Sequence, residues 1–248
     1  MLEIPTKFGV WPAEAALRHR GFSGTSLPMK LTTALLSMAF LFSAVQASAE
    51  VSKKQLGDLR STIIRYQKAA YVEIDLEKTV VSEILGREKT NKGKAFLASK
   101  RFRLELNEPD KSLIVYDGGT LWNAQYPPEG SGGKVQVAKA KLDKKNQNQI
   151  LLGDLLVEQG LMAKFDMLDA KQDGTTLEIT AKPKSTQIQV SDLKFRINTK
   201  DKVFNEVEYS DELGNKTTMK FSGTVFQKKK NAKIFQYTPE KGAQVTEL

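Results

Sequence analysis

The sequence contains no cysteine and a single histidine, His19, among its 248 residues. Without cysteine the chain forms no disulfide bond, so its stability must come from an ordinary hydrophobic core. Residues 50–248 contain neither residue type, which excludes Ser-His-Asp and Cys-His catalysis and Cys/His zinc sites from that part of the chain. No GxxxxGK[ST] loop is present to hold a nucleotide, and no recognisable paired-carboxylate motif is present. We therefore expect no enzyme, with no catalytic residue, metal or cofactor.

An export leader is the clearest signal near the N terminus. Lys30 precedes the apolar run Leu31–Val45, after which Ala47 and Ala49 supply the small residues that a signal peptidase requires. A membrane anchor is the alternative, but an anchor needs about 20 apolar residues to cross a bilayer, and this run is shorter. We therefore expect residues 29–49 to be a cleavable signal peptide, and residues 50–248 to form one mature domain outside the cytoplasm.

Residues 1–28 lack the features of a leader. They include Pro5, Pro12 and Pro28 and show no sustained hydrophobic period. We expect translation to start at Met29, with residues 1–28 an upstream extension added by a misplaced start codon.

At the far end of the leader, Glu50 stands where a lipid-anchored bacterial protein needs cysteine. The mature chain is therefore expected to carry no lipid anchor.

The expected mature chain is basic. Residues 1–49 contain four of the 38 basic and two of the 29 acidic residues, which leaves residues 50–248 with a net charge of +7. Such a surface suits nucleic acid, an anionic membrane or an acidic partner, and the export leader argues against nucleic acid. The densest basic run is 228–230, between two strand-like segments, and a solvated turn is the simpler interpretation of it.

Two segments show the period of a helix. Ser52–Gln67 carries one apolar stripe, and Ser52 suits the N-cap position. Gln147–Gln159 has a wider apolar face, and Gly160 is expected to end it. The stripe residues are Leu56, Leu59 and Ile63 in the first segment, and Ile150, Leu151, Leu152, Leu155 and Leu156 in the second.

Most of the remaining chain alternates apolar and polar residues with a period of two, which predicts antiparallel strands with one wet face. Strands are expected between Tyr71 and Tyr126, with a hairpin turn at 117–119 and a loop at 127–133. Further strands are expected at 164–170, 176–181, 192–199, 204–210, 216–221 and 233–237. The helices are too few to alternate with strands in a parallel sheet. These patterns predict a mainly β (α+β) fold: a strongly curved antiparallel sheet forming an incomplete β-barrel, with helices covering its open face as a lid.

Two motifs resemble the LolA family of periplasmic outer-membrane lipoprotein carriers. The first runs from Phe102 to Trp122 and reads as an aromatic strand, Pro-Asp, an aliphatic triplet and Asp-Gly-x-Thr-Leu-Trp. The second is the ending Phe235–Val245, in which Tyr237 and Glu240 replace a usual Phe and Pro. The leader and the two helices also come in the family's order. Ala98 and Ser99 stand where the family often has an Arg-Pro pair whose Arg holds the lid, so these positions are not expected to form that latch.

The resemblance implies a soluble periplasmic protein of a Gram-negative bacterium that binds lipoprotein acyl chains in an apolar cavity and carries them from the inner to the outer membrane. The implied partners are acylated lipoproteins and an inner-membrane ABC-type lipoprotein-releasing transporter. Whether an outer-membrane acceptor lipoprotein is a further partner is left open. A monomer without nucleic-acid partners is expected. The lid residues would be Leu56, Leu59, Ile63, Leu151, Leu152, Leu155 and Leu156. The cavity residues would be Phe96, Phe102, Leu104, Leu106, Trp122, Leu177, Ile179, Phe195, Ile197, Val207, Tyr209 and Phe221.

Periodicity alone leaves other interpretations open. On its own it favours a filled core without any cavity, because most apolar faces are simply packed. A periplasmic lipid- or lipoprotein-sensing regulatory domain with the same half-barrel is the alternative function. Such regulators usually carry a further domain, for which residues 50–248 leave little room. A membrane-anchored acceptor of the same fold is disfavoured by Glu50 at the expected cleavage site.

Overall fold

One twelve-stranded sheet contains all the strands of the described residues, which are 50–248 except 142–159, 187, 189 and 212 in this computed structural model. These residues belong to one compact unit of the chain, residues 46–248. The strands are β1 Tyr71–Ser82, β2 Arg87–Ala98, β3 Arg101–Glu108, β4 Ser112–Tyr116, β5 Thr120–Gln125, β6 Gln136–Lys141, β7 Phe165–Asp173, β8 Thr176–Pro183, β9 Asp192–Asn198, β10 Val203–Ser210, β11 Lys216–Gln227 and β12 Gln244–Glu247.

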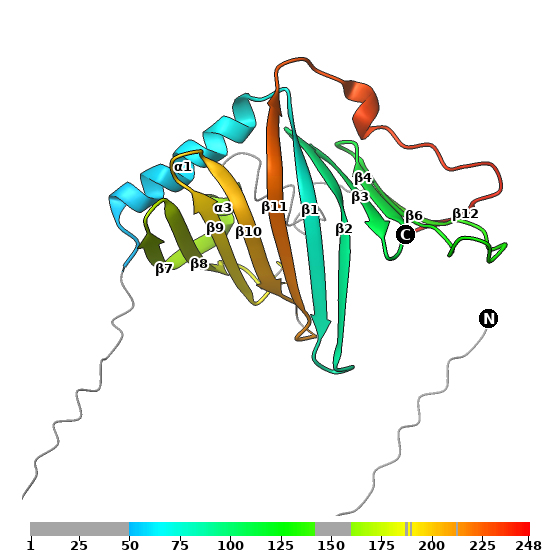
Figure 1. Ribbon diagram of the computed structural model, residues 1–248, viewed down its shortest axis with the longest axis horizontal. Helices are drawn as coiled ribbons and strands as arrows, with labels where there is room; N and C mark the ends of the chain where they lie inside the picture. The colour runs from blue at the N-terminus through cyan, green and yellow to red at the C-terminus, as the bar shows by residue number, and fades with distance from the viewer. Residues whose placement is uncertain (1–49, 142–159, 187, 189, 212) are drawn as a thin grey trace, which may run out of the picture. The chain divides into compact units, whose positions relative to one another are not determined.

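The sheet is curved and does not close (Figure 1). Its strand order is β12-β6-β5-β4-β3-β2-β1-β11-β10-β9-β8-β7, so β12 and β7 form its two edges. Neighbouring strands are antiparallel except β12 and β6, which are parallel. The predicted incomplete barrel is thereby confirmed. The sequence patterns missed two strands, β6 and β12, which are short and carry little apolar alternation.

The predicted turn at 117–119 joins β4 to β5 and sets their register. Asp117 Oδ1 accepts hydrogen bonds from the backbone N–H groups of Gly119 and Thr120, at 2.9 and 2.8 Å, and Gly118 takes a φ of +106°. Such a φ favours glycine because it has no Cβ to clash with the backbone. The turn places Tyr116 opposite Leu121 and Val115 opposite Trp122 in the β4–β5 hairpin.

Helix α1, Lys53–Lys68, lies across the β7–β11 half of the sheet (Figure 1). Ser52 caps it as predicted, in a capping box: Ser52 Oγ accepts from the Gln55 N–H, and Gln55 Oε1 accepts from the Ser52 N–H. Leu59 and Ile63 are buried in the core cluster that the sheet forms. The helices that the structure describes are too short or too polar to cross a bilayer.

Two predictions of secondary structure are wrong. Gly160 does not end a helix, because α3 spans Gly160–Lys164 and buries Leu161 against the sheet. The predicted strand at 233–237 is instead a 3-10 turn, η2 Ala232–Phe235, which buries Phe235. The residues that follow it pair with no strand until β12. The rest of the predicted second helix, Gln147–Gln159, lies outside the described residues.

Close strand packing at Gly93 generates the first testable prediction. A Cβ added at Gly93 would lie 1.7 Å from the carbonyl oxygen of Glu105 in β3, beside a register shift between β2 and β3. We expect Gly93→Ala to lower the free energy of unfolding by roughly 2 kcal/mol or more, because backbone must move. Urea-induced unfolding followed by circular dichroism measures this change.

Gly57 is the matched control for that measurement. It lies inside α1, and a Cβ added there meets no atom within 4 Å. Gly57→Ala should therefore raise stability by about 0.5–1 kcal/mol, as alanine does in an exposed helix interior. Equal effects of the two substitutions would contradict the packing described here.

Candidate functional site

The inner face of the curved sheet, which α1 packs against, is the candidate site. Strand alternation places ten of the twelve predicted cavity residues on this face. They are Phe102, Leu104, Leu106, Leu177, Ile179, Phe195, Ile197, Val207, Tyr209 and Phe221. Cross-strand pairs join them into rows, such as Ile179–Phe195–Val207–Met219 across β8 to β11.

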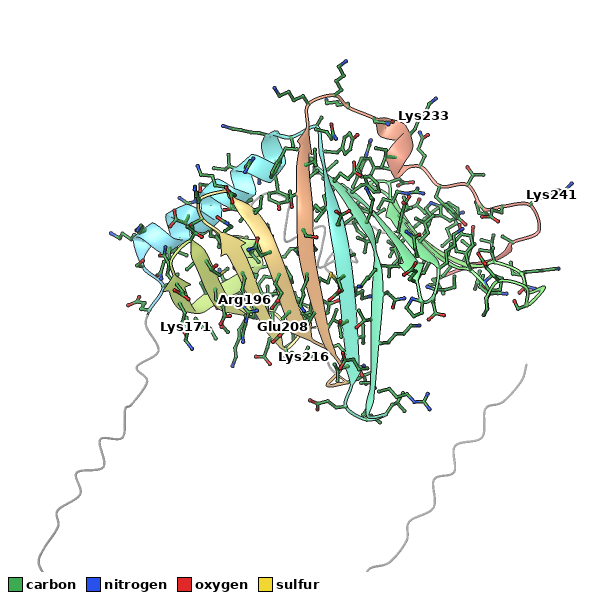
Figure 2. All side chains as sticks on the ribbon, in the orientation of Figure 1. Lys171, Arg196, Glu208, Lys216, Lys233 and Lys241 are labelled. Atoms are coloured by element: carbon green, nitrogen blue, oxygen red, sulfur yellow. The ribbon has the colours of Figure 1, made fainter. Side chains whose placement is uncertain are left out.

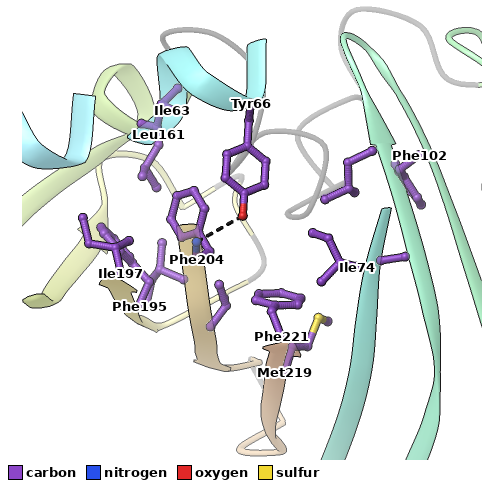
Figure 3. Packing of buried hydrophobic residues seen from close by; sticks show 14 of the residues in the cluster. Ile63, Tyr66, Ile74, Phe102, Leu161, Phe195, Ile197, Phe204, Met219 and Phe221 are labelled. Carbon is purple, nitrogen blue, oxygen red and sulfur yellow. Dashed lines mark hydrogen bonds between the residues drawn. The ribbon is translucent and has the colours of Figure 1, made fainter. Parts of the chain in front are cut away.

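The inner face is deeply buried. Phe195, Ile197 and Leu177 are each 0% exposed, and Phe221 is 8% exposed. Burial of a side chain of this kind stabilises the fold by about 1.5–3 kcal/mol. Figure 3 shows Phe195, Ile197, Met219 and Phe221 converging beneath α1.

The opposite face of the same strands is charged and paired. Arg196 of β9 contacts Glu178 of β8 at 2.7 Å and Glu206 of β10 at 2.5 Å, and the hydrogen bond with Glu178 is the main cause that raises the arginine pKa. Lys216 pairs with Glu208 at 3.0 Å on the same face (Figure 2). The sheet in this half therefore separates an apolar inner surface from an outer surface of cross-strand ion pairs.

Phe96 and Trp122 are not on the inner face, so their prediction as cavity residues is wrong. In β2 the buried inner residues are the smaller Ala95 and Leu97, and Phe96 between them pairs with Glu73 and Arg103 on the outer face. Size misled the prediction here, because a Phe is a more obvious core residue than an Ala. Trp122 pairs with Val115 on the outer face too.

Trp122 belongs to a second, smaller apolar cluster on the outer face. Its buried members are Leu113, Val115, Ala124 and Val137, and the C-terminal segment covers them. The Trp122 and Tyr237 rings lie 5.6 Å apart, and Ala243 packs nearby. The two motifs that carry the family resemblance therefore pack against each other.

Arg103 fastens the same C-terminal segment. Its Nη1 donates to the carbonyl oxygens of Ile234 and Gln236, at 3.3 and 3.5 Å, while its Nε pairs with Glu105 at 2.5 Å. Beyond this point Gln244 pairs with Gln136 as β12 joins β6. The chain end is thus held on the outer face and leaves the inner face to the helices.

Helix α1 is attached to the sheet by residues that the sequence patterns missed. Tyr66 Oη accepts a hydrogen bond from the Phe204 backbone N–H at 3.1 Å (dashed in Figure 3). The Tyr66 ring also meets the edges of Phe204 and Phe226, at 5.4 and 5.1 Å. Burial raises the pKa of Tyr66 to about 12. A signal was present, because Tyr66 lies three residues after Ile63 and seven after Leu59, on the same helical face.

Arg65 adds a second attachment. Its guanidinium lies 4.0 Å from the centre of the Phe226 ring, and its Nη1 donates to the Asp201 carbonyl. Ala98, where the family often has arginine, follows the inward-facing Leu97 and therefore points to the outer face. An arginine at that position would point away from α1. Among the described residues, polar attachments of α1 to the sheet come from Tyr66 and Arg65.

The predicted lid residues have different outcomes. Leu59 and Ile63 are buried between α1 and the sheet, and Leu56 is half-buried. Leu151, Leu152, Leu155 and Leu156 lie outside the described residues, so their role as a lid stays a prediction. The described part of the chain holds no group of three or more acidic, histidine or cysteine side chains placed to bind a metal ion.

A half-open barrel whose apolar inner face is covered by a helix defines the class of protein. Residues 72–238 match the family model of the outer membrane lipoprotein carrier protein LolA. That match spans well over half of the chain, so the chain belongs to the LolA family.

Curated relatives carry the same name. An outer-membrane lipoprotein carrier protein of Pseudomonas syringae pv. syringae (strain B728a) is 26% identical over 226 residues, which cover 88% of this chain and 99% of the relative. Another, from Xanthomonas axonopodis pv. citri (strain 306), is 31% identical over 172 residues, covering 66% of this chain and 77% of the relative.

Solved structures are more distant. A LolA superfamily protein from Nitrosomonas europaea aligns with a TM-score of 0.40 and 10% identity, covering 73% of this chain and 97% of that one. The lipoprotein LppX of Mycobacterium tuberculosis aligns with a TM-score of 0.41 and 9% identity, covering 73% and 100%.

The attachment of α1 yields a prediction for Tyr66→Phe. This substitution keeps the ring but leaves the buried Phe204 N–H without its acceptor, which costs roughly 1–3 kcal/mol. We expect hydrogen exchange at the Phe204 amide to speed up, together with exchange in α1, while exchange in β4 and β5 stays unchanged.

Uniform acceleration across the whole sheet would contradict a local role for Tyr66, because it would mean that the substitution lowers global stability alone. Tyr71→Phe is the matched control. Tyr71 is half-buried at the start of β1, where its ring meets Phe235 at 6.5 Å, and it does not contact α1 through the attachments described above.

Proposed function

We propose that this protein is a periplasmic carrier that shields the acyl chains of lipoproteins on its inner face and carries them from the inner to the outer membrane. The observation that carries the proposal is the buried apolar cluster on the inner face from β3 to β8. Part of this cluster lies under α1, a helix that a few specific contacts hold in place. Family membership supports the cargo class. The chemistry is binding and release, without any covalent step.

The physical requirement is to keep acyl chains out of water. Each methylene removed from water is worth about 0.8 kcal/mol, so a lipoprotein with several chains cannot cross an aqueous compartment unaided. In the described structure the apolar side chains of the inner face are buried and pack on one another. Loading therefore requires α1 to move aside, and the apolar contacts that are lost must be replaced by contacts with the acyl chains.

The leader supports the compartment. We propose that residues 29–49 are removed on export and that residues 50–248 act as a monomer in the periplasm. An inner-membrane ABC-type transporter would load the carrier, and an outer-membrane acceptor would receive the cargo where one exists. The net charge of +7 on residues 50–248 suits contact with acidic protein surfaces or anionic lipid headgroups.

Release of lipoproteins from spheroplasts tests this function. Purified carrier added to spheroplasts that make an acylated lipoprotein should bring that lipoprotein into solution as a one-to-one complex, seen by native mass spectrometry. A variant cargo whose acylated cysteine is replaced by serine is the matched control and should form no complex. Binding of both cargo forms with equal affinity would show that acyl chains are not what is recognised.

Two substitutions in β11 test the assignment of faces. Phe221 is on the inner face and 8% exposed, whereas Val225 pairs with Glu73 on the outer face and is 49% exposed. Phe221→Asn puts an amide against the acyl chains, at a cost of about 1–3 kcal/mol, and should reduce release roughly tenfold or more. Val225→Asn should leave release unchanged, provided that circular dichroism shows both variants folded. The reverse order of effects would contradict binding on the inner face.

A further inference from the structure

The inner face of the sheet carries a lysine for which lipoprotein binding gives no reason. Lys78 lies in β1 between Leu76 and Val80, and strand alternation places all three on the inner face. Its cross-strand neighbours are Met219 in β11 and Asn91 in β2. Lys78 therefore continues the inner-face row of Met219, Val207 and Phe195, six residues along β1 from Val72 near α1.

Lysines on the outer face of the same strands are paired with carboxylates. Lys94 contacts Glu73 at 2.6 Å, and Lys92 and Lys220 approach Glu77 at 3.7 and 3.8 Å. Lys78 has no ion pair with any residue of the chain that the structure describes. The sheet thus neutralises these outer charges and leaves an inner one uncompensated.

The surroundings of Lys78 make this charge costly. Burial, with a further contribution from the nearby Lys89 ammonium, lowers the pKa of Lys78. Lys89 is itself paired with the Asp110 carboxylate. Asn91, which is 9% exposed, donates from Nδ2 to the Asp110 carbonyl at 3.3 Å. The inner face therefore presents, at Lys78, one unpaired ammonium beside a fixed amide.

We propose that the inner face binds a long-chain fatty acid, with its carboxylate paired to Lys78 and its chain lying along the apolar rows toward Val72. This proposal rests on the carrier function, because both use the same apolar face. A β-strand rises about 3.3 Å per residue, so Val72 lies about 20 Å from Lys78, a distance comparable to an extended long acyl chain.

A carboxylate matches the site better than a phosphate. Lys78 offers one positive charge, and the other nearby ammonium, that of Lys89, is already neutralised by Asp110. A fatty-acid carboxylate brings one negative charge and balances the site. A phosphate monoester would bring a second negative charge without a partner, and an unpaired buried charge is costly.

Competition between a charged and a neutral lipid of equal chain length tests the proposal. The exported protein, freed of lipid, is titrated with palmitate and with hexadecanol by displacement of a fluorescent acyl probe. We expect palmitate to bind roughly tenfold more tightly, the gain typical of a hydrogen-bonded ion pair. Lys78→Met should abolish this preference and leave hexadecanol binding unchanged, and Lys78→Gln gives a second neutral variant should the methionine variant fail to fold.

Two further variants serve as controls. Lys78→Arg keeps the charge and should keep the preference for palmitate. Lys92→Met removes an outer-face lysine of β2 and should also keep it. Thermal unfolding is measured for each variant, so that loss of preference is scored only in folded protein.

The outcomes separate this proposal from the carrier function. Equal affinity of the wild type for palmitate and hexadecanol overturns the carboxylate site and leaves acyl binding by the inner face intact. Failure to bind either lipid counts against both. Tighter binding of lysophosphatidate than of palmitate overturns the choice of a carboxylate, and a preference that survives Lys78→Met and Lys78→Gln overturns the role of Lys78.

Discussion

Burial of the inner sheet face is the constraint on which the rest of the structure depends. Twelve strands in one open sheet expose a broad apolar surface, and an exposed surface of that kind would drive aggregation. Helix α1 covers part of it through Leu59, Ile63 and Tyr66. The same apolar surface that stabilises the closed form is what acyl chains would contact once α1 moves. Under the proposed function, folding and cargo binding would therefore draw on one set of contacts.

The two faces of the sheet have different tasks because strand alternation keeps them separate. The outer face carries cross-strand ion pairs around Arg196 and a small cluster that the C-terminal segment covers. Trp122 and Tyr237 join the two family motifs in that cluster. These motifs are thus explained by holding the chain end against the barrel wall. The inner face, which we propose to bind the cargo, has no comparable sequence motif, because many apolar combinations can line it.

Much of the fold was predictable from the sequence, and the failures have physical causes. Regular alternation and turn residues such as Asp117 identified most strands and the open, curved sheet. The prediction for Phe96 was wrong because β2 places Ala95 and Leu97 on the inner face. The larger side chain of Phe96 made it the more obvious core candidate. Strands β6 and β12 were not predicted because pairing with neighbouring strands, and not apolar alternation, defines them. Tyr66 was missed because a tyrosine near the end of a helix is usually assigned to the surface. Its burial depends on the Phe204 backbone N–H, a hydrogen-bond donor that only the folded structure reveals.

The central claim is that acyl chains of a lipoprotein lie against the inner face. A photoreactive amino acid placed at single positions measures this contact directly in loaded carrier. The account predicts cross-links to the acylated lipoprotein from Val207 and Tyr209, which face inward in β10, and none from Val225 or Trp122, which face outward. Cross-links confined to the outward positions would show that the cargo binds elsewhere and would contradict the account.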